Sequence, residues 1–92
     1  MITIAFDVDG TLLKSDDSAN ENTRTLLRIL SEMPDTRIIV WSGGGSEYAR
    51  MMAKRIHVDH WVDECATKDG FINPDITFDD MDAQLGKVNI RI

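Results

Sequence analysis

Two groups of carboxylates stand near opposite ends of the sequence, and each directly follows a short apolar run. The first lies in the run Asp7-Val8-Asp9-Gly10-Thr11, and the second is the pair Asp79-Asp80. Asp-Gly pairs and acidic pairs are both common in surface turns, so each group alone also fits an ordinary turn. Carboxylates gathered at one place repel one another and need a cation. Mg²⁺ is usually held by one or two carboxylates with waters and phosphate oxygens, so the two groups together predict a Mg²⁺ site.

A glycine-rich segment has the composition of an anion-binding loop. Ser42-Gly43-Gly44-Gly45-Ser46 lies between an apolar run and a predicted helix. Free backbone N–H groups and a hydroxyl at a helix start bind phosphate, which makes Ser42 and Gly43 candidate ligands; a flexible loop is the alternative. No Gly-Lys-Ser/Thr follows, which excludes a Walker loop. Tyr48 stands where a dinucleotide-binding loop has its third glycine.

Short apolar runs predict the strands that carry these residues. Four of them end at polar residues, as buried strands of a parallel sheet do: residues 2–6, 38–41, 60–62 and 76–78. Residues 87–92 alternate instead, with Val88, Ile90 and Ile92 facing one way. That alternation is typical of a half-exposed edge strand.

Helices fit between the first three of these runs. Apolar residues of the first helix recur at spacings of three and four: Leu26, Ile29, Leu30 and Met33. Asn20 or Asn22 would cap its start, and Pro34 would end it. The second helix follows the glycines with Ser46 as a candidate cap. Its apolar stripe is Tyr48, Met52 and Ile56, and Met51 is also expected in the core. Residues 63–75 show no helical period and predict a loop with at most one helical turn.

Strands that alternate with helices predict an α/β fold. We expect a Rossmann-like, mainly parallel sheet of about five short strands with flanking helices. In such sheets the functional site lies beyond the carboxyl ends of the strands. Asp7, Ser42 and Asp79 each come directly after a strand, so we expect these three side chains at one edge of the sheet.

Composition bounds the class of protein. The chain has 92 residues, a formal charge of −6 and 42% hydrophobic residues, which predicts one globular domain over residues 1–92. No run approaches the roughly 18 apolar residues of a membrane span, and no leader sequence is expected. Cys65 is the only cysteine, so a disulfide framework is excluded and a reducing cytoplasm is expected. The acidic charge argues against a protein that coats nucleic acid.

The order of the polar features resembles the haloacid dehalogenase superfamily of aspartate-based phosphohydrolases. Asp-x-Asp-Gly-Thr follows the first strand, Ser42 follows the second, Lys68 comes next, and Asp79-Asp80 follows a later strand. The resemblance covers essentially the whole chain, and residues 7–11 are its most specific part. Taken alone, a single lysine such as Lys68 is most often solvated surface. The resemblance implies a Mg²⁺-dependent phosphomonoester hydrolase that works through an aspartyl-phosphate.

The resemblance also implies a role for each matching residue. Asp7 matches the nucleophile, and Asp9 matches the general acid/base. Lys68 matches the cation that holds the nucleophile and the phosphoryl group. Ser42 matches the phosphate-binding hydroxyl, with Gly43 beside it. The implied metal ligands are Asp7, the backbone carbonyl of Asp9 and Asp79, with Asp80 assisting directly or through a water molecule.

The chain departs from the family pattern because it has no room for a cap domain. Residues 11–22 leave space for a short flap only, and residues 63–75 barely suffice for a crossover. An open site implies phosphorylated substrates that include macromolecules, such as a phosphoprotein or a nucleic-acid end. A homo-oligomer would supply missing specificity elements, and no membrane partner is expected.

Two other functions fit parts of the pattern. A catalytically weak binding or regulatory module would keep the fold; the short flap favours it and intact Asp7 and Asp9 disfavour it. A response-regulator type of phosphoacceptor domain also gathers acids and a lysine at a sheet edge. Such a domain, however, has its acidic pair after the first strand and its lysine late in the sequence. Here the pair comes last and Lys68 precedes it, so the order disfavours that class. Structural or surface roles are expected for the remaining candidates: Trp41, His57, His60, Trp61 and Cys65.

Overall fold

The computed structural model describes all of residues 1–92 and contains one five-stranded sheet with two α-helices. The elements in chain order are β1 (Ile2–Asp7), α1 (Glu21–Ser31), β2 (Thr36–Ser42), α2 (Ser46–Arg55), the 3₁₀ turn η1 (Asp59–Trp61), β3 (Glu64–Thr67), β4 (Ile76–Asp79) and β5 (Val88–Arg91). The strand order is β3-β2-β1-β4-β5, and every pair is parallel. The expected Rossmann-like α/β fold without a cap is confirmed. Neither helix has the length and apolar character needed to span a membrane.

β1 is the central strand, and its composition explains why. It pairs with β2 on one side and β4 on the other, so its backbone is hydrogen-bonded along both edges. Ile4 and Phe6 enter one apolar cluster, and Ala5 enters a second cluster on the opposite face. Phe6 stacks on Phe78 of β4 with ring centroids 4.8 Å apart. A strand buried on both faces in this way delivers Asp7 to the middle of the sheet's carboxyl edge.

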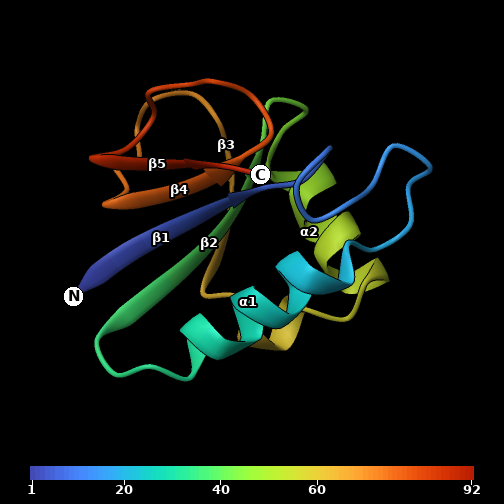
Figure 1. The fold of residues 1–92 in the computed structure, drawn as a ribbon, viewed down its shortest axis with the longest axis horizontal. Helices are drawn as coiled ribbons and strands as arrows, with labels where there is room; N and C mark the ends of the chain where they lie inside the picture. Colours follow the sequence, from blue (N-terminus) through green and yellow to red (C-terminus); the bar gives the residue numbers. More distant parts are fainter.

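The two faces of the sheet are covered differently. Figure 1 shows both helices on one side of the sheet, while the segments that follow β3 and β4 arch over the other side. The helix-bearing face holds the larger apolar core, into which Leu27 of α1 and Ala53 of α2 pack. The other face holds a small cluster that includes Trp41 and Ile72. Loops rather than helices therefore cover the face on which part of the site is built.

Both helices begin where a nearby oxygen accepts one of their first N–H groups. Asn20 caps α1, as predicted, because its side-chain oxygen accepts a hydrogen bond from the Thr23 N–H at 3.4 Å. The prediction that Ser46 caps α2 was wrong. Ser46 is already the first helical residue, and its N–H donates to Thr67 Oγ1 of β3 at 3.0 Å. Gly45 precedes it with a φ of 111°, a conformation that favours glycine.

Three apolar residues of the helices that were expected in the core lie outside it. Ile29, Met33 and Met51 are 48%, 51% and 57% exposed. Leu27, by contrast, is fully buried. Only two helices cover this face of the sheet, so residues on the flanks of each helix have no further helix to pack against.

The third strand does not lie where the sequence predicted it. The strand expected at residues 60–62 was wrong, because Asp59–Trp61 form the 3₁₀ turn η1. β3 instead occupies Glu64–Thr67, inside the segment expected to be a loop. This strand lies at the edge of the sheet beside β2 and is only half-buried, so it needs no continuous apolar run. Trp61 packs against the core from the helix side, with the Arg24 guanidinium 5.5 Å from its ring.

β5 is an edge strand, as predicted, but its apolar residues are not its buried ones. Val88 and Ile90 are 52% and 41% exposed, because no helix reaches this end of the sheet. The polar Asn89 points the other way and joins β5 to β4 and to the preceding loop. Its Oδ1 accepts from Thr77 Oγ1 (2.7 Å), Leu85 N–H (2.9 Å) and Gly86 N–H (2.8 Å), and its Nδ2 donates to the Gly86 carbonyl (2.7 Å).

The end of β5 fixes the backbone of the acidic pair. The Ile92 N–H donates to the carbonyl of Asp79 at 2.8 Å, and Arg91 Nε donates to the carbonyl of Asp80 at 3.3 Å. The hydrogen bonds of Asn89 hold the loop that joins these two strands. β5 therefore acts as a brace that sets where the two carboxylates point.

We predict that Asn89→Ala lowers the stability of the fold. The substitution leaves two backbone N–H groups and the Thr77 hydroxyl without their acceptor, which costs about 2 kcal/mol. For a domain of this size that loss lowers Tm by roughly 10 °C in thermal unfolding followed by circular dichroism. Asn22→Ala is the control, because Asn22 is exposed on α1 and should change Tm little. Equal melting temperatures for Asn89→Ala and the wild type would contradict the brace.

Candidate functional site

Four residues predicted from the sequence converge at the carboxyl edge of the sheet. Asp7 ends β1, Asp79 ends β4, Asp80 follows it, and Lys68 directly follows β3. Ser42 ends β2 and lies one position beyond Trp41, the residue paired with Asp7. The parallel sheet thus brings together side chains that lie up to 73 positions apart in the sequence.

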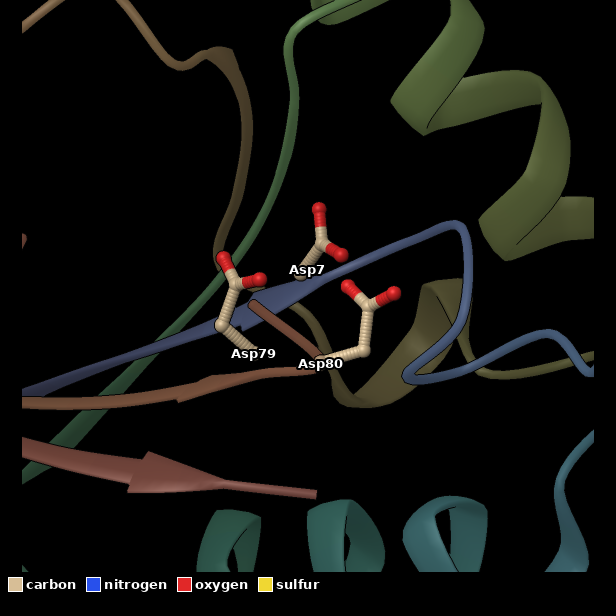
Figure 2. Close-up of side chains that lie close together, drawn as sticks. All are labelled: Asp7, Asp79 and Asp80. Carbon is tan, nitrogen blue, oxygen red and sulfur yellow. The ribbon is translucent and has the colours of Figure 1, made fainter. Parts of the chain in front are cut away.

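The three carboxylates form a compact oxygen-rich cluster. Asp7, Asp79 and Asp80 each contribute an oxygen atom, and these atoms all lie within 4.8 Å of one another. Figure 2 shows the three side chains rising from the ends of β1 and β4 towards one space. Asp7 is 7% exposed and Asp79 is 2% exposed, so neither charge is well hydrated. Clustered carboxylate oxygens of this kind are the ligand set that a hard divalent cation prefers.

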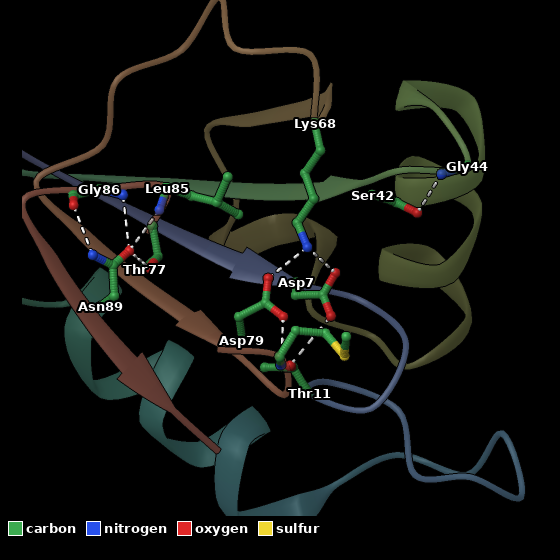
Figure 3. A network of polar contacts seen from close by, with 11 residues as sticks. Asp7, Thr11, Ser42, Gly44, Lys68, Thr77, Asp79, Leu85, Gly86 and Asn89 are labelled. Atoms are coloured by element: carbon green, nitrogen blue, oxygen red, sulfur yellow. Dashed lines mark hydrogen bonds and ion pairs between the residues drawn. The ribbon is translucent and has the colours of Figure 1, made fainter. Parts of the chain in front are cut away.

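Lys68 connects two of these carboxylates. Its Nζ donates to Asp7 Oδ1 at 2.8 Å and to Asp79 Oδ2 at 2.5 Å, as Figure 3 shows. Its backbone N–H donates to the carbonyl of Ser42 at 3.0 Å, which anchors the lysine beside the end of β2. The Lys68 side chain is therefore held by both ends, and the prediction that it lies beside Asp7 agrees with the structure.

Burial and neighbouring charges shift the pKa values of Asp7 and Asp79 in opposite directions. Burial raises the pKa of Asp7 to about 6, and the charge of Asp79 adds to this rise although Lys68 opposes it. Burial also acts to raise the pKa of Asp79, but hydrogen bonds from Lys68 and from the Met81 N–H outweigh it and leave that pKa below its usual value. Burial acts to lower the pKa of Lys68, yet its two carboxylate partners raise it overall. Lys68 is therefore charged at neutral pH.

The loop after β1 fits closely against the acidic pair. Gly10 has a φ of 83°, and a Cβ at this position would collide with the carboxylate of Asp80. Only glycine meets both conditions. Thr11 is fully buried, and its hydroxyl lies 3.4 Å from Asp7 Oδ2 as a long hydrogen-bond donor. The Thr11 side chain thus braces the Asp7 carboxylate from the side opposite Lys68.

The glycine-rich segment forms a tight loop at the same edge. The Gly44 N–H donates to Ser42 Oγ at 3.0 Å, and the Gly45 N–H donates to the Ser42 carbonyl at 3.2 Å. Ser42 is 3% exposed, whereas Gly43 is exposed and has open space around it. Because Ser42 Oγ accepts one hydrogen bond, its own proton is left to donate to an anion in front of the loop.

Asp9 lies apart from the three-carboxylate cluster. Its side chain is exposed, and its Oδ1 accepts a hydrogen bond from the Tyr48 hydroxyl at 2.7 Å. This hydrogen bond raises the pKa of Tyr48 to about 12. The sequence placed Tyr48 only on the apolar face of α2, and the contact was missed because nothing in the spacing links a residue of that helix to Asp9.

The segment between Asp9 and α1 is a short flap rather than a domain. Lys14 and Ser18 form its tip, where the Lys14 N–H donates to the Ser18 carbonyl at 2.8 Å. Leu12 and Leu13 at its base are buried in the main core. No further domain is inserted between β1 and α1, so the chain has no cap there, as the sequence predicted.

The remaining candidates do not join the site. His57 and His60 are exposed on the surface. Cys65 is half-buried in β3, and burial raises the pKa of its thiol, which makes it a poor nucleophile. Trp41 is buried under the loop that follows β3, and its indole Nε1 has no hydrogen-bond partner.

No protein-family model matches the chain, and neither does any curated protein or solved structure. The arrangement offers a candidate cation site rich in oxygen, an ammonium group held by two carboxylates and a candidate anion loop at one edge of the sheet.

The raised pKa of Asp7 predicts how the stability of the metal-free protein depends on pH. The pKa of this carboxyl lies above its ordinary value of 3.8, at about 6 in the folded protein, so protonation favours folding. Its stabilising contribution is complete below about pH 4 and is lost as the pH rises through about 6. When the pH falls from about 7 to about 5, the free energy of unfolding rises by roughly 1 kcal/mol, which raises Tm by roughly 4–8 °C.

Thermal unfolding in chelator at these two pH values measures the gain. Asp7→Asn removes the titrating carboxyl and should abolish most of it. Asp82→Asn changes an exposed carboxyl outside the cluster and should keep it. If Asp7→Asn gained as much stability as the wild type, a group other than Asp7 would be responsible.

Proposed function

We propose that the protein is a Mg²⁺-dependent phosphomonoester hydrolase of the haloacid dehalogenase type, with Asp7 as its nucleophile. The observation that carries the proposal is the Lys68 ammonium held between the buried carboxylates of Asp7 and Asp79, with Asp80 beside them. A carboxylate is a poor nucleophile towards a phosphate dianion because like charges repel. A fixed cation next to the carboxylate removes part of that repulsion, and a metal ion removes more.

The proposed reaction has two steps, and Asp7 and Asp9 divide the work. In the first, an Asp7 carboxylate oxygen attacks phosphorus, the ester P–O bond breaks, and the protonated Asp9 carboxyl gives its proton to the leaving oxygen. In the second, Asp9 takes a proton from water as the water oxygen attacks the aspartyl-phosphate. Inorganic phosphate leaves, and both carboxyl groups return to their starting states. Ser42 and the Gly43 N–H would hold the phosphate oxygens.

The carboxylate cluster fits a magnesium ion. Asp7 and Asp79 are buried, Asp80 is half-buried, and all three offer hard oxygen ligands within the spacing that one ion needs. Asp7, Asp79 and Asp80 would hold the ion, with the backbone carbonyl of Asp9 as a further ligand. A bound Mg²⁺ would supply positive charge next to the transferring phosphoryl group.

The open edge of the sheet suggests the class of substrate. With no cap domain and only a short flap after β1, few contacts to a small metabolite are available, so we propose a phosphate ester on a larger molecule. A nucleic-acid end would be a substrate only, because the net charge of −6 opposes general nucleic-acid binding. A second copy of the chain would supply further contacts. A cytoplasmic location fits the single cysteine.

A catalytically weak phosphate-binding module of the same fold is the alternative. The observation that favours it is the exposed position of Asp9, outside the carboxylate cluster. Such a module would bind Mg²⁺ and phosphate without turnover. Turnover therefore separates the two functions.

We predict Mg²⁺-dependent release of p-nitrophenol from p-nitrophenyl phosphate. Asp7→Asn keeps the shape of the side chain but removes the nucleophile, so kcat/KM should fall on the order of 10³-fold or more. Asp82→Asn, prepared in the same way, should keep the wild-type rate and controls for non-specific effects of removing an acidic side chain. Activity in Asp7→Asn equal to that of the wild type would refute the assignment of Asp7, and no activity in either protein would favour the binding module.

Mg²⁺ should also stabilise the fold, and Asp80 offers the clearest test. The Asp80 carboxylate makes no hydrogen bond to Lys68, unlike Asp7 and Asp79, so Asp80→Asn removes repulsion with little loss of contacts. With a dissociation constant of about 1 mM, about 10 mM Mg²⁺ adds roughly 1.4 kcal/mol, or roughly 5–10 °C in Tm.

The expected pattern for Asp80→Asn is a higher Tm than the wild type in chelator and a much smaller shift with Mg²⁺. Asp82→Asn should match the wild type in both conditions. Equal Mg²⁺ shifts in Asp80→Asn and the wild type would mean that Asp80 is not a ligand.

A further inference from the structure

The hydrogen bond between Tyr48 and Asp9 links α2 to the loop that carries the proposed acid/base. The Tyr48 hydroxyl donates to Asp9 Oδ1 at 2.7 Å, while Asp9 Oδ2 makes no hydrogen bond in the structure. Tyr48 is the only tyrosine of the chain and the only side chain that holds the exposed Asp9 carboxylate. One oxygen of Asp9 is therefore fixed, and the other is left free.

Tyr48 itself is held in place by rigid parts of the fold. Its ring packs against the main apolar core and next to the glycine-rich loop, where a Cβ added to Gly44 would lie 3.4 Å from Tyr48 Cδ2. Ala49, the next residue of α2, is fully buried. The Ser46 N–H ties the start of the helix to Thr67 of β3. The packing of the ring and the anchored start of the helix set the place of the hydroxyl.

The flap has a second attachment to the same helix. The guanidinium of Arg55, at the end of α2, donates to the backbone carbonyl of Asp17 near the flap tip. Asp17 has a φ of 66°, so the flap turns back sharply at this point. Tyr48 and Arg55 thus tie both ends of residues 9–17 to one face of α2.

We propose that Tyr48 is the positioning residue for Asp9: its hydroxyl holds Oδ1 so that Oδ2 faces the leaving group. The proposal rests on the proposed function, in which Asp9 donates and accepts the proton. In the first step the proton on Oδ2 passes to the leaving oxygen as the P–O bond breaks, and in the second Oδ2 takes the proton of water. The Tyr48 proton stays on its own oxygen throughout and is not transferred.

The dependence of rate on the leaving group tests this role. Tyr48→Phe keeps the ring in its packing site and removes only the hydroxyl. Phenyl phosphate has a poor leaving group that needs the proton of Asp9, so kcat/KM should fall about tenfold. The nitrophenolate of p-nitrophenyl phosphate leaves with little help, so its kcat/KM should fall less than about threefold. Equal losses for both esters would overturn the positioning role.

A double-mutant cycle then shows whether Tyr48 acts through Asp9. In an Asp9→Asn background, adding Tyr48→Phe should change the phenyl phosphate rate less than about twofold. A further tenfold loss in that background would show that the hydroxyl acts independently of Asp9 and would refute the proposal. Glu47→Gln, an exposed change on the same turn of α2, should leave both rates unchanged.

A crystallographic comparison of the free proteins separates failure of this inference from failure of the proposed function. In the wild type the Asp9 side chain should be ordered in one rotamer against Tyr48. In Tyr48→Phe, Asp9 should occupy more than one rotamer while the carboxylate cluster stays unchanged. A single, unmoved Asp9 rotamer in Tyr48→Phe would overturn the inference even if no phosphate ester were hydrolysed. Absence of turnover with the predicted change in Asp9 would refute only the proposed function.

Discussion

One ammonium group between two buried carboxylates is the contact on which the candidate site depends. Lys68 Nζ lies within hydrogen-bond distance of both Asp7 and Asp79, which are otherwise like charges with little access to water. Two unit charges about 4 Å apart repel by roughly 4 kcal/mol at an effective dielectric constant near 20. Lys68 offsets part of this repulsion, but with Asp80 the cluster places three carboxylates beside one ammonium group and keeps an excess of negative charge. That excess is the reason for proposing a divalent cation at the site.

The strand order explains how a chain of this length assembles such a contact. With β1 in the centre, the ends of β2 and β4 lie on either side of Asp7, and β5 braces the acidic pair from the outer edge. Lys68 follows β3, on the far side of β2, and its backbone is fixed to Ser42. Only a long side chain reaches Asp7 and Asp79 from there. The helices contribute less directly. They cover the face of the sheet opposite the loops that follow β3 and β4, and they contact the flap and the glycine-rich loop.

Much of this arrangement follows from the sequence because it depends on local signals. Apolar runs that stop at Asp7, Ser42 and Asp79 predict buried parallel strands, and parallel strands must end at one edge. The position of β3 was not predicted, because a half-buried edge strand needs no apolar run to mark it in the sequence. The contact between Tyr48 and Asp9 could not be predicted, because it joins a helix to a loop 39 positions away in the sequence. Only the packed fold determines how close these two side chains lie in space. The role of Asn89 could not be predicted, because the alternation in β5 indicated that its apolar residues, and not Asn89, would be the buried ones.

The most direct test of the account is to find where a phosphoryl group becomes attached during turnover. The wild-type protein, mixed with Mg²⁺ and p-nitrophenyl phosphate and quenched rapidly in acid, should gain the mass of one phosphoryl group. Peptide mapping of the acid-quenched protein should place that group on Asp7. An unmodified protein under rapid turnover, or a phosphoryl group on Ser42 in place of Asp7, would contradict the central claim that the lysine-bridged aspartate is a nucleophile.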